Sequence, residues 1–333
     1  MLMNYDHEIQ NSIKNNLLKY ADIFDFRNTP SEDLFNNYYM FCRESLDINS
    51  AKYNINPNVF AFKNGFNSNA EAKRTVDNAF GIFVNLGLLG YCAENFQNNT
   101  TLDKYCEQNF PHLVEKFDIK PSALAFQITT QFSYYHELAH LIQFSKKAEN
   151  FALQERNVDC NEYHEIRHIL EINADTYASV SIVTHIVQYI DKCFGKNPEQ
   201  KLVEDTILLL SSCLLNYITS FYDDLAKIYF KMYCHPHPVF RLFNVMMNIG
   251  YHVNEGIYAE HENINIDTKE LTKRMLELYK NLEESKVFKT NLNEALDAAA
   301  GVKDEIVQYL GDLIEFKTTE YFNAMDKWNE HII

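Results

Sequence analysis

The segment formed by residues 121–142 restricts the fold most, because Glu137 is the only charged residue in it. Proline is favoured at the first helical position, so a long helix is predicted to begin at Pro121. A helix with almost no charge on any side is expected to lie in the core of the protein. The rest of the chain, with only 9 Gly and 7 Pro in 333 residues and 46% hydrophobic residues, has the size and composition to form the mostly helical body that such a helix needs.

Other segments complete a coarse prediction of the secondary structure. Residues 1–50 indicate helices, one of them with Ser31 as its N-cap. Two short runs rich in aromatic and β-branched residues, 56–65 and 79–87, predict an antiparallel pair of strands. The predicted class is therefore mainly α with a small antiparallel β-sheet. Further helices are expected over residues 161–190 and 199–233 and through the acidic last 80 residues, and a loop over residues 146–159.

Composition excludes several functions. A formal charge of −16 disfavours nucleic acid as a partner, because no basic stripe is present to contact phosphates. The 7 cysteines are scattered without a Cys-x-x-Cys pair, which is typical of reduced thiols in a cytoplasmic protein. The N-terminus lacks the pattern of a signal peptide. Neither uncharged run, 79–93 or 206–222, is predicted to span a membrane, so we expect a soluble protein.

The sequence contains the pattern His-Glu-x-x-His twice, at His136–His140 and at His164–His168. On a helix, side chains at i and i+4 lie on one face, so two such histidines can bind one zinc ion. The glutamate between them can then act as a general base toward water at the metal. The residues around each copy indicate which one has this role.

The first copy is the better candidate. Its helix is uncharged around the histidines, whereas the second copy places Arg167 between them, where an unpaired charge would be costly to bury. A hydrolytic zinc site also needs a third protein ligand and an open fourth position. We predict that Glu171 supplies the third ligand. Asp175, on the same helix face, is expected to accept the free ring N–H of a ligand histidine. The predicted ligands are thus His136, His140 and Glu171.

The histidines of the second copy lie on the helix stripe that carries Glu171. His168 is one turn from Glu171 and is expected either to line the cleft or to bond to groups around the metal. His164 is about 10 Å from Glu171 along the helix axis, too far to share the ion. A half-buried polar face of an amphipathic helix is the simpler interpretation of both histidines.

His-Glu-Leu-Ala-His followed by Glu-x-x-Ala-Asp, with Ala174 before Asp175, resembles the gluzincin zinc endopeptidases. Within them it is similar to the group of the HtpX heat-shock protease and the CAAX prenyl proteases. That group has two strands before the motif, and PNVFAF and GIFVNLGLL stand in their places here. It also has a downstream His followed six residues later by an Arg, and HPHPVFR places His235 and Arg241 at that spacing. The likeness covers roughly residues 56–245. A looser likeness, carried by the general motif alone, is to phage-exclusion (Lit-type) peptidases.

The resemblance implies a zincin-like core over residues 54–250, between helical extensions at 1–53 and 251–333. The chain departs from the family pattern in three ways. His237 stands in place of the second proline of the downstream motif, a polar insert interrupts the predicted hairpin, and the membrane helices of the family are absent from the sequence. The last of these departures argues against a membrane location and against prenylated substrates.

The expected activity is zinc-dependent hydrolysis of peptide bonds in a protein or peptide substrate, with one zinc ion per chain and Glu137 as general base. His235 is either the donor to the oxyanion or part of a helix-ending His-Pro turn without a chemical role, and Arg241 is expected to hold its loop by pairing with an acid. An extended peptide is expected to add to an open edge of the second strand, at Ile82, Phe83, Val84 and Asn85, the alternative being that this strand is internal to a small sheet. Two alternatives are a non-catalytic zinc module for binding or regulation, and a hydrolase of a non-peptide amide.

Overall fold

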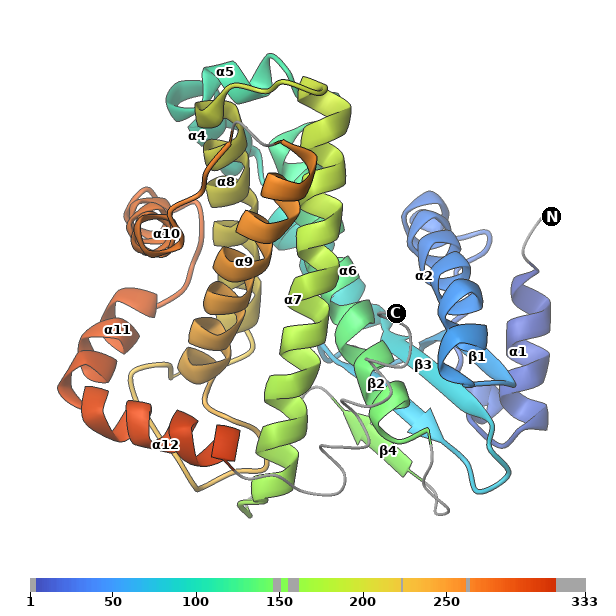
Figure 1. Ribbon diagram of the computed structural model, residues 1–333. Helices are drawn as coiled ribbons and strands as arrows, with labels where there is room; N and C mark the ends of the chain where they lie inside the picture. The colour runs from blue at the N-terminus through green and yellow to red at the C-terminus, as the bar shows by residue number, and fades with distance from the viewer. Residues whose placement is uncertain (1–3, 146–150, 155–161, 223, 262–263, 316–333) are drawn as a thin grey trace. The chain divides into compact units, whose positions relative to one another are not determined.

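The computed structural model describes residues 4–145, 151–154, 162–222, 224–261 and 264–315 (Figure 1). They are mainly helical, with one mixed sheet of four strands. Packing divides the chain into two compact units that alternate along the sequence. Of the described residues, unit 1 comprises 4–91, 133–145 and 151–154, and unit 2 comprises those from 92–132 and from 162–315. The functional division at residues 53 and 250 stays a prediction.

The sheet belongs to unit 1 and has the strand order β1-β3-β2-β4. The strands are β1 (Asn58–Lys63), β2 (Ala70–Arg74), β3 (Phe80–Asn85) and β4 (Phe151–Gln154). Strand β3 is parallel to β1 and antiparallel to β2, which in turn pairs antiparallel with β4. The sheet is thus mixed, and β3 is an inner strand buried along its whole length.

The antiparallel pairing predicted for residues 56–65 and 79–87 is wrong. The two strands are neighbours, with Phe60 opposite Ile82, but they are parallel. The polar insert between them forms β2 and returns through a tight turn in which the Thr75 N–H donates to the Ala79 carbonyl. Asn78 adopts the left-handed conformation in this turn, with φ 59°, which asparagine tolerates well. Because β2 and β3 form the hairpin, β1 meets β3 through a crossover and runs parallel to it.

The outer edge of β1 is closed by side chains of helix α1 (Tyr5–Lys14). The Phe60 N–H donates to Glu8 Oε2, and the Phe62 N–H donates to the Tyr5 hydroxyl, both at 3.0 Å. Unpaired strand edges invite pairing with other strands, and these bonds use the amide groups that would otherwise be open. Helix α2 (Glu32–Tyr53) also packs on β1 and adds aromatic side chains to the core of unit 1.

The predicted helix positions agree with the structure at three points and fail at one. Helix α2 begins directly after Ser31, α6 (Pro121–Gln143) begins at Pro121, and α7 (Glu165–Phe194) covers most of residues 161–190. The long helix predicted over residues 199–233 is wrong, because α8 (Gln200–Thr219) ends early. Where the structure describes residues 220–237, they form no regular helix, and aromatic packing rather than helical hydrogen bonding holds that stretch.

In unit 2, helix α8 is covered by α9 (Pro238–Glu260) and α10 (Thr268–Glu284), and α9 also packs on α7 (Figure 1). Every residue of α8 from Asp205 to Thr219 is buried; the sequence is uncharged from Thr206 onward, and Asp205 pairs with Lys201 and Arg274. The remaining helices of the described residues, drawn from both units, are α3 (Leu86–Cys92), α4 (Thr100–Asn109), α5 (Pro111–Val114), α11 (Leu292–Gly301) and α12 (Lys303–Glu315), with a 3₁₀ turn at Tyr20–Asp22 and a π-helical turn at Ala93–Gln97.

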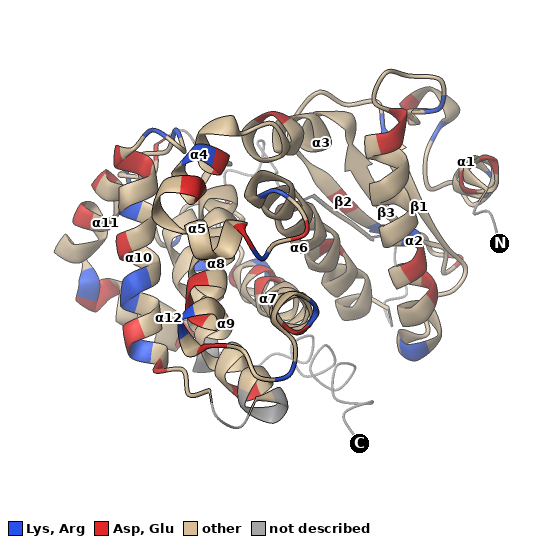
Figure 2. Cartoon of the chain, turned by 90° about the horizontal axis from the view of Figure 1, so that it is seen from above, with Lys and Arg blue, Asp and Glu red and all other residues tan. Residues whose placement is uncertain are grey.

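Helix α8 is the one described helix whose length and apolar composition would allow it to cross a membrane, and 89% of that stretch is buried in the protein. Charged residues of both signs follow one another along α10 (Figure 2), whereas α12 has one lysine at its start and only acidic charged residues after it. Pairs such as Lys273–Glu277, at 3.7 Å, are exposed and contribute at most about 1 kcal/mol each.

No disulfide joins the six cysteines in the described part of the chain.

Candidate metal centre

The first His-Glu-x-x-His lies in the last two turns of α6. His136, Glu137 and His140 are all 0% exposed. The two imidazole rings are nearly perpendicular, at 88°, and their Nε2 atoms lie 3.1 Å apart. The helical spacing therefore brings two nitrogen donors to one point, as the sequence predicts.

Gln143, one turn beyond, determines which nitrogen of His140 is available. His140 Nδ1 lies 2.8 Å from the amide oxygen of Gln143. Because that oxygen only accepts, Nδ1 carries the hydrogen and Nε2 keeps its lone pair. Two nitrogens bound tetrahedrally to one zinc ion are about 3.3 Å apart, which the observed 3.1 Å separation matches closely.

The third member of the group comes from α7. The potential ligand atoms of His136, His140 and Glu171 all lie within 4.8 Å of one another, and Glu171 is 1% exposed. In the described part of the chain this is the one group of three or more His, Cys, Asp or Glu side chains so arranged. Two imidazoles and one carboxylate form a donor set that suits a transition-metal ion and leaves coordination positions open. The residues present therefore fit a metal ion.

Helix α9 supports the face of α7 that carries Glu171. Arg241 donates two hydrogen bonds to Asp175, from Nε at 2.8 Å and from Nη2 at 2.7 Å, and both side chains are almost fully buried. Arg241 thus pairs with an acid, as expected. For His140 the acceptor is Gln143, not Asp175. A two-pronged buried pair of this kind fixes the rotation of α7 relative to α9.

His235 lies near Glu171 but in a different element from the one predicted. It belongs to the irregular segment that precedes α9 and is not at the end of a long helix, because α8 stops at Thr219. Its Nδ1 is 3.3 Å from Glu171 Oε1, and the residue is 5% exposed. In the described part of the chain its Nε2 has no hydrogen-bond partner. The ring is therefore placed beside the proposed ligand with one nitrogen available.

His237, two residues further on, has a structural role. Its Nδ1 accepts a hydrogen bond from the Val239 N–H at 3.2 Å, which caps the first turn of α9. Burial lowers its pKa to about 4, so the ring is neutral at neutral pH. The cap and the neighbouring prolines explain why His235 and His237 differ despite their proximity in sequence.

The second His-Glu-x-x-His does not form a pair of ligands. His164 is the N-cap of α7 and has extended backbone angles, φ −131° and ψ 103°, so it is exposed and outside the helix. His168 is 0% exposed and uses both ring nitrogens: Nε2 lies 2.7 Å from the Tyr233 carbonyl, and Nδ1 bonds to the Tyr309 hydroxyl. No lone pair of His168 is left for a metal ion.

The expectation that Ile82 to Asn85 offers an open strand edge to a peptide is wrong. These residues lie in β3, which pairs with β1 on one side and with β2 on the other. The prediction failed because the strand formed by the polar insert was not recognised. Within the described residues, β1 and β4 are the edge strands, and the outer edge of β1 is already occupied by side chains of α1.

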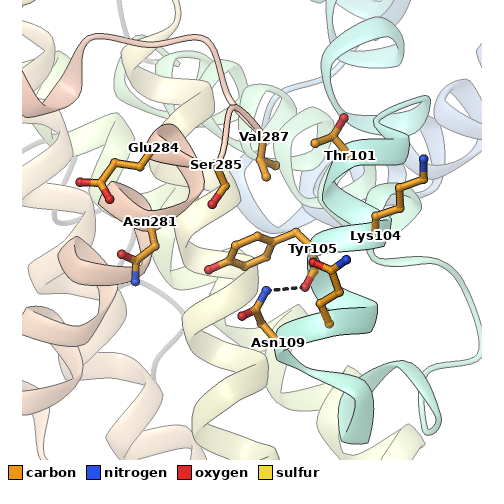
Figure 3. A pocket seen from close by; sticks show the side chains of 9 residues that line it. Thr101, Lys104, Tyr105, Asn109, Asn281, Glu284, Ser285 and Val287 are labelled. Atoms are coloured by element: carbon orange, nitrogen blue, oxygen red, sulfur yellow. Dashed lines mark hydrogen bonds between the residues drawn. The ribbon is translucent and has the colours of Figure 1, made fainter.

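Two cavities are described, and both lie in unit 2. The larger, of about 410 Å³, is lined by polar and mostly exposed residues of α4, α10 and the turn after α10, among them Lys104, Asn281 and Glu284 (Figure 3). The smaller, of about 220 Å³, lies against α6, α7 and α8 and includes Gln131 and His185. Neither cavity is lined by a residue of the candidate metal centre.

Sequence reasoning missed two residues that orient the histidines. Gln143 is three positions after His140 and so lies on the same helix face, which is a signal that could have identified it. Tyr309 is far from His168 in sequence, and only the tertiary structure shows their contact.

Neither a protein-family model nor a curated protein nor a solved structure matches the chain. What supports a metal-dependent function is therefore the chemistry of this centre, together with the motif resemblance.

Proposed function

We propose that this protein is a zinc-dependent endopeptidase of the gluzincin type. The observation that carries the proposal is the buried group of His136, His140 and Glu171, with Glu137 on the same helix as the two histidines. A purely structural zinc site is usually closed by four protein ligands and has no use for an adjacent glutamate. The proposal accounts for both the three-ligand set and the position of Glu137.

The choice of zinc rests on the kind of chemistry that Glu137 allows. The same two-histidine, one-carboxylate set also binds ferrous iron in oxygenases. A carboxylate next to such a centre is suited to proton transfer during hydrolysis, which requires no redox change. A zinc ion held by the three residues would supply Lewis acidity toward water and toward the carbonyl oxygen of the substrate.

Glu137 is proposed as the general base and then the general acid. Its carboxylate takes a proton from the attacking water and delivers it to the nitrogen of the leaving amine. Proton transfers of this kind contribute about 100- to 10,000-fold to the rate. Glu137 is 0% exposed, so bulk water does not reach its carboxylate. The proton is therefore exchanged with the reacting groups and not with the solvent.

His235 is proposed to stabilise the oxyanion. Its Nδ1 lies 3.3 Å from Glu171 Oε1, and an N–H at Nε2 would donate to the developing charge. Arg241 and Asp175 act through α7, because their paired hydrogen bonds hold the helix face that carries Glu171.

The proposed substrate is a protein or peptide, and the proposed location is the cytoplasm. No disulfide joins the six cysteines of the described residues, which suits a reducing compartment. Neither the substrate nor the location follows from the metal centre alone, so a proteome is the appropriate first substrate.

The test is N-terminal profiling of a cell lysate treated with the zinc-loaded wild type and, in parallel, with Glu137→Gln. We expect new protein N-termini with the wild type and none above background with the variant. The same new termini in both samples, or none in either, would contradict the proposal. Iron instead of zinc in the purified wild type would replace it with an oxidative function.

A further inference from the structure

The segment between α8 and α9, residues 220–237, carries His235 but has no regular helix or strand where it is described. Side-chain packing therefore has to hold it. The ring of Tyr229 contacts those of Tyr233 and His237, with centroids 4.6 and 4.7 Å apart. Phe230 stacks on Phe240 of α9 at 5.2 Å. These ring contacts hold residues 229–230 and His237 in place, but they do not hold the backbone next to His235.

His168 provides that missing contact. Its Nε2 lies 2.7 Å from the carbonyl oxygen of Tyr233, two residues before His235. Because a carbonyl only accepts, Nε2 carries the hydrogen, and Nδ1 is left to accept from the Tyr309 hydroxyl. Burial lowers the pKa of His168 to about 4, which is consistent with a neutral ring that makes both bonds.

Tyr309 brings helix α12 into the same arrangement. The residue is 3% exposed, and its ring contacts Phe230 at 5.6 Å and Phe240 at 4.9 Å. Lys231 and Asp312 add an exposed ion pair at 3.8 Å. Helix α12 thus packs on the segment, and the segment lies against α7 through His168.

We propose that His168 and Tyr309 form a clamp that positions His235. In this proposal the second His-Glu-x-x-His is not a metal site: its buried histidine is a positioning residue, and the C-terminal helix α12 is needed because it supplies the other half of the clamp. The catalytic part of the proposal rests on the proposed function, in which His235 stabilises the oxyanion. The holding part does not depend on activity.

The holding part is tested through Cys234, which is 0% exposed and adjacent to His235. The rate at which N-ethylmaleimide labels Cys234 in the folded protein, read by peptide mass spectrometry, reports how often the segment opens. Tyr309→Phe removes only the hydroxyl, and losing one buried hydrogen bond should raise this rate about tenfold. Tyr251→Phe, at an exposed tyrosine of α9, is the matched control and should leave the rate unchanged.

Cys213, buried in α8, separates local opening from unfolding. We expect it to stay protected in Tyr309→Phe while Cys234 becomes reactive. Equal labelling of Cys234 in Tyr309→Phe and the wild type would overturn the clamp. Simultaneous labelling of Cys213 and Cys234 would also overturn it, because the hydroxyl would then support the whole unit and not this segment.

The catalytic part is tested with His168→Gln, whose amide can still donate to the Tyr233 carbonyl but replaces the imidazole that accepts from Tyr309. We expect kcat to fall about tenfold, with KM and zinc content unchanged, because only the orientation of His235 is affected. Loss of zinc in this variant, or an unchanged kcat together with faster labelling of Cys234, would overturn the positioning role. A wild type that binds zinc but hydrolyses nothing would refute the proposed function and the positioning role, while the labelling result would still decide the clamp.

Discussion

His-Glu-x-x-His occurs in α6 and again at the start of α7, and the same pattern has different surroundings in the two places. In α6 both histidines are inside the helix and completely buried, and their Nε2 atoms meet at 3.1 Å. At the start of α7 the helix begins between the histidines, so His164 is an exposed N-cap and His168 is buried.

Two physical requirements separate a metal site from its copy in sequence. The pattern must lie wholly within a helix, since i and i+4 share a face only there. Each ring must also keep a free lone pair. In His140, Nδ1 donates to Gln143, and Nε2 keeps its lone pair. In His168, Nε2 carries the hydrogen that it donates to the Tyr233 carbonyl, and the lone pair of Nδ1 accepts from the Tyr309 hydroxyl. The bonds at the second nitrogen thus decide whether a buried histidine is a ligand or a structural tie.

The largest expected effect concerns the ion pair behind Glu171. Arg241→Ala should lower the free energy of unfolding by about 3–5 kcal/mol, because it leaves the carboxylate of Asp175 buried without its two-pronged partner. Near the second copy, Lys231→Ala breaks an exposed pair and should cost less than about 1 kcal/mol. Urea unfolding followed by circular dichroism measures both. Equal losses would mean that the two surroundings do not differ as described.

The glutamates of the two copies allow a matched comparison of chemistry. Glu137→Gln should lower kcat at least about 100-fold, or about 2.7 kcal/mol, with zinc content unchanged, because the general base is lost while the ligands remain. Glu165→Gln, at the same position of the second copy, should change kcat less than twofold. Steady-state kinetics on a cleaved peptide identified by the profiling experiment would show a comparable loss in both variants if the assignment were wrong.

The pH dependence of stability reports on the buried histidine of the second copy. Unfolded histidine takes up a proton below about pH 6.5, whereas burial lowers the pKa of His168 in the folded chain to about 4, with Glu171, His235 and His164 as the neighbouring charged or titratable groups. Unfolding therefore binds a proton in this window, and stability falls as the pH falls from about 6.5 toward 4.

Between pH 7 and pH 5 this one residue should lower the free energy of unfolding by about 2 kcal/mol. Urea midpoints of the wild type should accordingly fall more on acidification than those of His168→Gln. His237, with a similarly lowered pKa, contributes equally to both proteins and cancels. Parallel pH profiles would show that His168 is not held neutral in the folded state.

The smallest effect is expected at Gln143. Gln143→Ala removes the acceptor that orients His140 but no ligand, so zinc affinity should fall about tenfold, measured by competition with a chromophoric chelator. Gln127→Ala, at an exposed position of the same helix, is the control and should leave affinity unchanged. An unchanged affinity in Gln143→Ala would show that the tautomer of His140 is fixed in another way.

Local pattern was sufficient to predict what lies within one helix. The start of α6 at Pro121, the shared face of His136 and His140, and the choice of Glu171 all follow from helical spacing and from the absence of charge. The parallel pairing of β1 with β3 could not be predicted, because it depends on whether a polar insert folds as a strand. The contact between His168 and Tyr309 depends on tertiary packing, for which a single sequence gives no signal.

The central claim, that the first copy binds the metal and the second does not, is tested most directly by metal analysis. The purified wild type, His136→Ala and His164→Ala would be dialysed against the same zinc buffer, and zinc would be measured by plasma mass spectrometry. We predict about one zinc ion per chain in the wild type and in His164→Ala, and almost none in His136→Ala. Zinc retained in His136→Ala but lost in His164→Ala would transfer the site to the second copy and contradict the account.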